Sequence, residues 1–158
     1  MDNEQRHKIF LEKVISLAVK NVRSKNNGPF VAALVKNGKI ISYGFNRVTE
    51  KHDPTLHAEI DAIRKASKKL KTFDLAGCVM YSSCQPCPMC FSAIYWANIK
   101  TVYYGASKED ASKYGFRDLK IYKELRSGKF SIDMKHIETG GRLEPFKAWN
   151  IKKDKIKY

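Results

Sequence analysis

The chain has 158 residues, of which 43% are hydrophobic and 11% aromatic. This composition excludes a disordered chain and predicts one folded domain over residues 1–158. The net charge of +14 allows a nucleic-acid partner, but the lysines are spread over the whole chain, so we favour general solubility. No stretch is apolar for long enough to span a membrane, and segment 1–8 lacks the apolar core of a signal peptide. We therefore expect a cytoplasmic protein without a membrane partner.

The first part of the chain predicts a helix followed by a β-hairpin. Residues 4–24 carry apolar side chains at the spacing of a one-sided helix, and the Asn-Asn-Gly-Pro run at 26–29 ends it. The continuous apolar run 30–35 predicts a central strand. Asn-Gly at 37–38 is a strong hairpin turn signal, so residues 40–45 are expected to form an antiparallel edge strand.

Helices and strands alternate through the rest of the chain. After a loop at 46–55, the pattern predicts helices at 57–70, 88–98, 119–126 and 145–153, and strands at 77–81, 101–104 and 132–138. Such alternation is typical of an α/β domain. We expect a three-layer α/β/α sandwich around a five-stranded mixed sheet.

Two short motifs at predicted helix starts carry metal chemistry. His57 and Glu59 form an H-x-E motif, and Cys87 and Cys90 form a P-C-x-x-C motif. Together these motifs are the signature of zinc deaminases. One imidazole and two thiolates give zinc three protein ligands, which leaves a coordination position for water. Glu59 is then placed to move protons between that water and a substrate.

Each motif alone has other interpretations. A lone histidine at a helix start is more often a surface or capping residue, and C-x-x-C also occurs in redox and iron–sulfur sites. Cys84 extends the run to C-x2-C-x2-C, as in a ferredoxin, but no fourth cysteine follows Cys90. We assign Cys84 to the end of a strand and Cys78 to the core.

Longer stretches around these motifs carry a family resemblance. The chain resembles the cytidine/deoxycytidylate deaminase superfamily, and within it the bacterial guanine deaminases, in P-T-L-H-A-E at 54–59, Y-S-S-C-Q-P-C-P-M-C at 81–90, A-I-Y-W-A at 93–97, G-F-R-D at 115–118, I-Y-K-E at 121–124 and P-F-K-A-W at 145–149. The resemblance covers nearly the whole chain from Gly28 to Tyr158. Gln85 departs from it, because the family usually has glutamate there.

The resemblance implies a cytidine deaminase-like fold and a set of site residues. It implies one zinc ion per subunit, with water or hydroxide as the fourth ligand beside His57, Cys87 and Cys90, and Glu59 as the catalytic proton shuttle. It also implies that Asp118 is a second catalytic carboxylate. The substrate-binding positions that it implies are Asn46, Phe30, Asp118, Trp96 and Tyr158.

Elementary chemistry agrees with a guanine substrate. Guanine presents N1–H and its 2-amino group as adjacent donors, and a carboxylate accepts such a pair with good geometry. Adenine has an acceptor at N1, which an ionised Asp118 would repel. Asp118 could instead cap a helix beginning at Leu119, and Asn46 could be a turn residue. With the resemblance we favour the pocket role for Asp118, and Asn46 could recognise the O6/N7 edge of the base.

We therefore expect hydrolytic deamination of guanine to xanthine and ammonia, a step of purine salvage or catabolism. A tRNA adenosine deaminase acting on a flipped-out anticodon nucleotide, or a deaminase of cytosine, guanosine or a triazine, remains an alternative. A non-enzymatic nucleic-acid-binding protein with structural zinc is a third class, which the intact Glu59 argues against. The resemblance also implies that the C-terminal helix and tail, 145–158, cross to the partner's active site in a domain-swapped homodimer.

Overall fold

The computed structural model describes residues 3–24 and 27–156 of the chain. Its elements, in chain order, are α1 (Asn3–Ser24), β1 (Val31–Lys36), β2 (Lys39–Phe45), α2 (Val48–Lys51), α3 (Ala58–Leu70), β3 (Cys78–Cys84), α4 (Pro88–Trp96), β4 (Thr101–Ala106), α5 (Lys108–Lys113), α6 (Asp118–Ser127) and α7 (Glu144–Ile151). None of the helices within these residues is long and apolar enough to cross a membrane. The short helix α2 lies in the segment 46–55, which the sequence predicted to be a loop, and α5 lies in a segment for which no element was predicted.

The sheet has the strand order β2-β1-β3-β4 and is mixed. β1 is antiparallel to both β2 and β3, whereas β3 and β4 are parallel. Asn37 and Gly38, which join β1 to β2, both have positive φ, at 50° and 73°. This is the backbone that a two-residue hairpin turn requires. The predicted hairpin, the central position of β1 and the edge position of β2 are confirmed.

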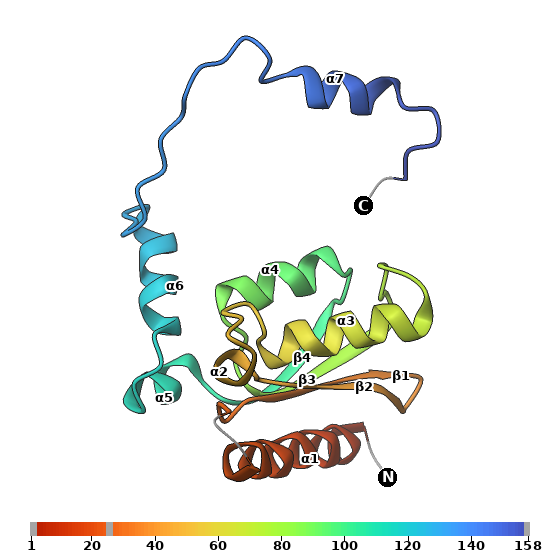
Figure 1. The fold of residues 1–158 in the computed structure, drawn as a ribbon. Coiled ribbons are helices and arrows are strands. Elements are labelled where there is room, and N and C mark those ends of the chain that lie inside the picture. Colours follow the sequence, from red (N-terminus) through yellow and green to blue (C-terminus); the bar gives the residue numbers. More distant parts are fainter. Residues whose placement is uncertain (1–2, 25–26, 157–158) are drawn as a thin grey trace.

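Helices cover both faces of the sheet, as Figure 1 shows, with α1 on one face and α3 and α4 on the other. Each face has its own core. Val14 of α1 packs with Val31, Val35 and Tyr81, while Ala62 of α3 and Ile94 of α4 pack with Leu34 and Met80. Gly44 of β2 makes close packing possible on the second face, because a Cβ atom there would collide with the backbone of Ala58 and Ala62. The helix that carries His57 and Glu59 is thereby held directly against β2.

The predicted fifth strand at 132–138 is wrong. Within the described residues the sheet has four strands, and 132–138 is irregular. The alternation of Ile132 and Met134 is suitable for a strand, but a single strand without a paired neighbour is not stable in water. The chain continues from α6 away from the sheet, as Figure 1 shows, and Ile132 and Met134 remain 74% and 75% exposed.

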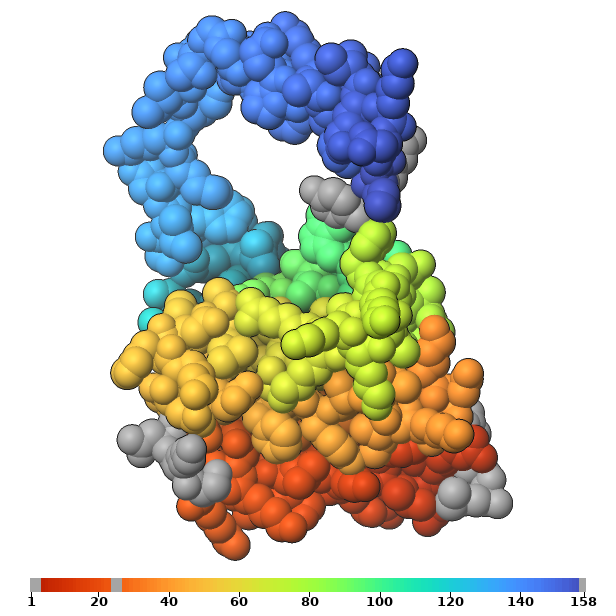
Figure 2. Space-filling model, turned by 45° about the vertical axis from the view of Figure 1, so that its right-hand side comes forward, coloured from red at the N-terminus to blue at the C-terminus, as the bar shows by residue number. Residues whose placement is uncertain are grey.

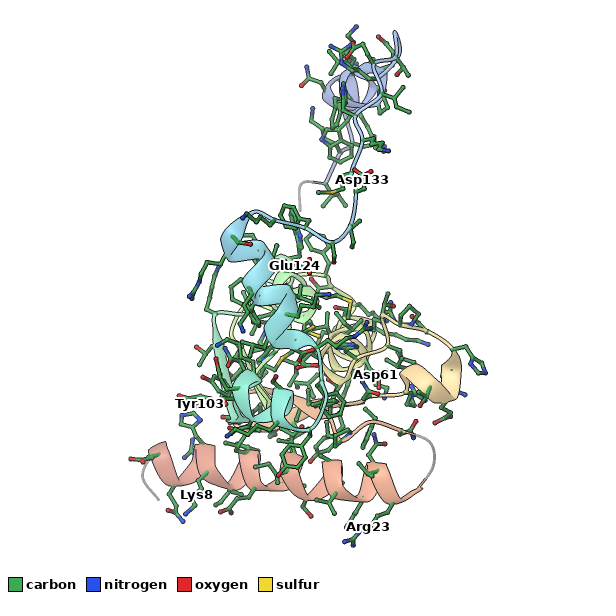
Figure 3. All side chains as sticks on the ribbon, turned by 90° about the vertical axis from the view of Figure 1, so that its left-hand side faces the viewer. Lys8, Arg23, Asp61, Tyr103, Glu124 and Asp133 are labelled. Carbon is green, nitrogen blue, oxygen red and sulfur yellow. The ribbon has the colours of Figure 1, made fainter. Side chains whose placement is uncertain are left out.

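The segment after α6 stands away from the body as an arm in Figure 2, and it contains α7. Asp133, labelled in Figure 3, lies on the irregular stretch that leads away from α6 toward α7. Apolar side chains along this arm contact little of their own chain, since Ile137 is 77%, Phe146 70% and Ile151 79% exposed. We call residues 129–156 the C-terminal arm.

Candidate active site

The two sequence motifs lie at the N-termini of two helices. His57 is the N-cap residue of α3 and Cys87 is the N-cap residue of α4, both with extended backbone angles. Neither uses its side chain to cap its helix, so the imidazole and the thiol are directed elsewhere. Proline at the first position of α4 suits the start of a helix, where its missing N–H costs nothing.

His57, Cys87 and Cys90 come together as a possible metal site, with their ligand atoms all within 4.8 Å of one another. His57 Nδ1 lies 3.6 Å from Cys87 Sγ and 3.6 Å from Cys90 Sγ. A tetrahedral zinc ion with ordinary bond lengths would separate a nitrogen ligand and a sulfur ligand by about 3.6 Å. The donor set and its spacing therefore fit zinc. Cys84 is not part of this group.

Glu59 lies beside the cluster without belonging to it. Its side chain is buried, Ser82 Oγ donates to its Oε1 at 3.1 Å, and Cys90 Sγ donates to its Oε2 at 3.4 Å. Burial raises the pKa of Glu59 above its ordinary value, and the negative charge of Cys87 raises it further. A buried carboxyl with a raised pKa, held by Ser82 beside a possible metal site, is suited to accept and return a proton.

The thiols differ in protonation because of their partners. A hydrogen bond from Cys90 and another from His57 lower the pKa of Cys87 to about 4, which makes it a thiolate. The hydrogen bond with Cys87 also raises the pKa of His57. Cys84 is different, since burial raises its pKa to about 11. Cys84 is therefore a protonated thiol in the wall of the site.

A cavity of about 430 Å³ opens onto the cluster. Its wall contains His57, Glu59 and Cys87, together with three of the predicted substrate-binding residues, Asn46, Phe30 and Asp118. Asp118 is the first residue of α6, and the N-cap position belongs to Arg117, so the alternative role of Asp118 as the cap of this helix does not apply. Burial raises the pKa of Asp118, and the negative charge of Cys87 adds to the effect.

One predicted substrate-binding residue among those that the structure describes, Trp96, lies away from this cavity. Trp96 lies at the end of α4, does not line the cavity and is 61% exposed. Tyr158 lies outside the described residues.

The structure adds neighbours that sequence analysis missed. Phe116 packs edge-on against Phe30, with ring centroids 4.7 Å apart, and Arg117 also lines the cavity. Phe116 and Arg117 directly precede Asp118 in the chain, and this position next to a predicted site residue could have identified them as site residues. Ser82 gave no signal, because its contact with Glu59 joins a strand to a helix 23 residues away.

Comparison with known proteins agrees with this arrangement. Residues 4–106 match the zinc-binding region of cytidine and deoxycytidylate deaminases. The guanine deaminase of Bacillus subtilis is 44% identical over 154 residues, which cover 96% of this chain and 99% of that protein. A solved structure of guanine deaminase from B. subtilis superposes with a TM-score of 0.91 and 43% identity, covering 100% of this chain and 99% of the other.

More distant relatives cover less of the chain. A tRNA-specific adenosine deaminase of Buchnera aphidicola is 40% identical over 116 residues, which cover 72% of this chain and 76% of that protein. A solved structure of a mutant protein with 8-azaguanine has a TM-score of 0.68 and 33% identity, and covers 71% of this chain and 65% of the other. The tRNA-specific adenosine deaminase thus matches part of the chain, while similarity over nearly the full length is found with a guanine deaminase. The chain belongs to the cytidine and deoxycytidylate deaminase family.

Proposed function

We propose that the protein is a zinc-dependent guanine deaminase, which converts guanine and water to xanthine and ammonia. The observation that carries this proposal is that one cavity is lined by His57, Cys87, Glu59, Asn46 and Asp118. A site for a metal, a proton-transfer group and two polar groups suited to a purine are thereby combined in a space of about 430 Å³. This is the chemistry that deamination of a base requires.

The polar groups select the base. The Asp118 carboxylate accepts the N1–H and 2-amino donors of guanine, an arrangement that adenine cannot make because its N1 is an acceptor. The Asn46 amide, which can both donate and accept, contacts the O6/N7 edge, and Phe30 with Phe116 packs against the ring. Two comparisons support this choice: the guanine deaminase relative matches over its full length, and 8-azaguanine, the ligand of a solved relative, carries the same pair of donors.

The side chains then divide the chemistry. One zinc ion per subunit, held by His57, Cys87 and Cys90, would supply an activated water molecule at neutral pH. Glu59 takes one proton from this water and transfers it to a ring nitrogen. It then takes the proton of the new C2 hydroxyl group and transfers it to the departing amine. The C2–O bond forms, the C2–N bond breaks, and the amine leaves as ammonia. Asp118 keeps the 2-amino group directed at the metal site, and its negative charge stabilises the amine as the amine gains a proton.

We also propose that the active unit is a homodimer in which the C-terminal arm is exchanged. The arm carries exposed apolar side chains, which would be more stable if they were buried against another surface. α4 presents Phe91, Tyr95 and Trp96, which are 61%, 65% and 61% exposed, and β4 has a free edge that a strand from a second copy could join. None of the four cysteines, all within the described residues, forms a disulfide, which fits the proposal of a cytoplasmic enzyme of purine breakdown or salvage.

The test is a substrate panel. Purified protein is incubated with guanine, guanosine, adenine, cytosine and a tRNA anticodon stem, and released ammonia and product are quantified. Guanine should be the substrate with the highest kcat/KM, and Glu59→Gln should lower kcat by about a thousandfold while zinc content stays unchanged. Glu109→Gln, which alters an exposed carboxylate on α5, is the matched control. Deamination of the tRNA stem in preference to guanine would contradict the assignment.

A further inference from the structure

We propose that Asp61, Asn21 and Gly28 are positioning residues that fix the Asn46 amide relative to the catalytic helix. This inference rests on the proposed function, in which Asn46 recognises the O6/N7 edge of guanine. None of the three is proposed to react with the substrate. Their role is to hold a recognition group at a set distance and angle from Glu59, a precision on which reaction rates and base selection depend.

Asp61, on α3, contacts the residue before Asn46 and the residue after it. It lies two residues after Glu59 on this helix and is 5% exposed; Figure 3 shows it on the body of the molecule. Its Oδ2 accepts the backbone N–H of Phe45 at 3.0 Å, and its Oδ1 pairs with Arg47 Nη2 at 3.4 Å. Phe45 and Arg47 are the immediate neighbours of Asn46.

The Asp61 carboxylate therefore bonds to more than one cation. Lys65, one turn further along α3, also contacts Oδ2 at 2.6 Å, so two cations and a backbone donor compensate the buried charge. A buried carboxylate with this many partners is held in one orientation. The end of β2 is consequently fixed to the same helix that carries Glu59.

The backbone of Asn46 is held at both of its polar groups. Its N–H donates to the carbonyl of Phe30 at 3.0 Å, and its carbonyl accepts Asn21 Nδ2 at 3.1 Å. Asn21 Nδ2 also donates to the carbonyl of Gly28 at 2.9 Å. The buried Asn21 amide on α1 thus joins the two segments that meet at the recognition residue.

Gly28 leaves the space that the Asn46 side chain occupies. A Cβ atom on Gly28 would lie 2.8 Å from Asn46 Oδ1 and 3.1 Å from Asn46 Cγ. Both distances are shorter than van der Waals contact, so any larger residue must displace the amide. Gly28 is not among the glycines with positive φ, which means that alanine can adopt its backbone and that Gly28→Ala acts on the amide itself.

The experiment compares guanine with 7-deazaguanine, which lacks the N7 acceptor. Wild type should have a higher kcat/KM for guanine than for 7-deazaguanine. The Asn46→Ala variant gives the ratio of the two values that remains when the amide is removed. Gly28→Ala and Asp61→Ala should raise KM for guanine about tenfold or more and reduce the preference toward that of Asn46→Ala, with kcat changed less than about threefold. Asp61→Asn keeps an acceptor for Phe45 N–H and should lie between wild type and Asp61→Ala.

Ser42→Ala is the matched control, because Ser42 Oγ donates to the carbonyl of Ala62 at 2.8 Å and is another buried link between β2 and α3. It should leave KM and the base preference as in wild type. Folded Gly28→Ala and Asp61→Asn proteins with wild-type preference would overturn the positioning role, as would an equal loss in Ser42→Ala. If wild type releases no xanthine from guanine, the proposed function fails first, which distinguishes the two outcomes.

Discussion

Glu59 shows how opposing effects on one residue are decided by magnitude. It lies in the first turn of α3, where the helix dipole stabilises a carboxylate by about 0.3–1 kcal/mol. That is less than one pKa unit, which corresponds to about 1.4 kcal/mol, whereas full burial shifts carboxyl groups by up to about 3–5 units. Burial therefore wins, and the pKa of Glu59 is raised. The same balance holds at Asp118, which is also in a first helical turn and also has a raised pKa.

The raised pKa of Asp118 predicts a pH dependence of substrate affinity. Only the ionised carboxylate accepts both donors of guanine, so protonation should weaken binding. Because the pKa is shifted upward from 3.8, KM for guanine should begin to rise, as pH falls, at a pH above the ordinary aspartate range. The measurement is KM against pH for wild type and Asp118→Asn. The variant should have a high KM with no such dependence, and a wild-type KM that stays flat until the protein unfolds would contradict the role.

At the scale of elements, the features that could be predicted are those that a short stretch of sequence determines by itself. The hairpin followed from Asn37-Gly38, and the metal site from the spacing of two motifs at helix starts. The contacts of Ser82 and Asp61 could not be predicted, because they join residues from different elements through space. The strand predicted at 132–138 was wrong for a related reason, since a strand depends on a neighbouring edge that the segment's own sequence does not contain.

A hydrogen bond joins α6 to the metal site. Tyr122 Oη donates to the carbonyl of Pro86 at 2.6 Å, directly before the ligand Cys87. A hydrogen bond of this kind is worth about 0.5–1.5 kcal/mol, so Tyr122→Phe should weaken zinc binding about 2- to 10-fold, as measured by competition with a chelator. Tyr114→Phe, at an 83% exposed tyrosine, should leave zinc affinity unchanged. Equal zinc affinity in the two variants would show that α6 does not support the metal site.

At the scale of the whole molecule, the body and the C-terminal arm have different physical requirements. The body buries its apolar side chains on both faces of the sheet, whereas the arm leaves Ile132, Phe146 and Ile151 at 70% exposure or more. Exposed apolar segments of this size on a folded protein usually mark an interface. α6, which carries Asp118, leads directly into the arm, so dimer formation and completion of the site are expected to depend on the same segment.

Arm exchange predicts complementation between two inactive or weakened chains. One chain carries Glu59→Gln with an intact arm, and the other keeps Glu59 but ends at Asn150. If each arm covers the partner's site, a mixed dimer places the intact arm over the intact site, so mixing after partial unfolding should restore kcat/KM for guanine well above the sum of the two parents. A chain ending at Ser127 should be monomeric by light scattering, near the 18.1 kDa of one full-length chain or below, and should not complement. An arm that covers its own site would give no gain on mixing, because the intact arm and the intact site would then remain on different chains.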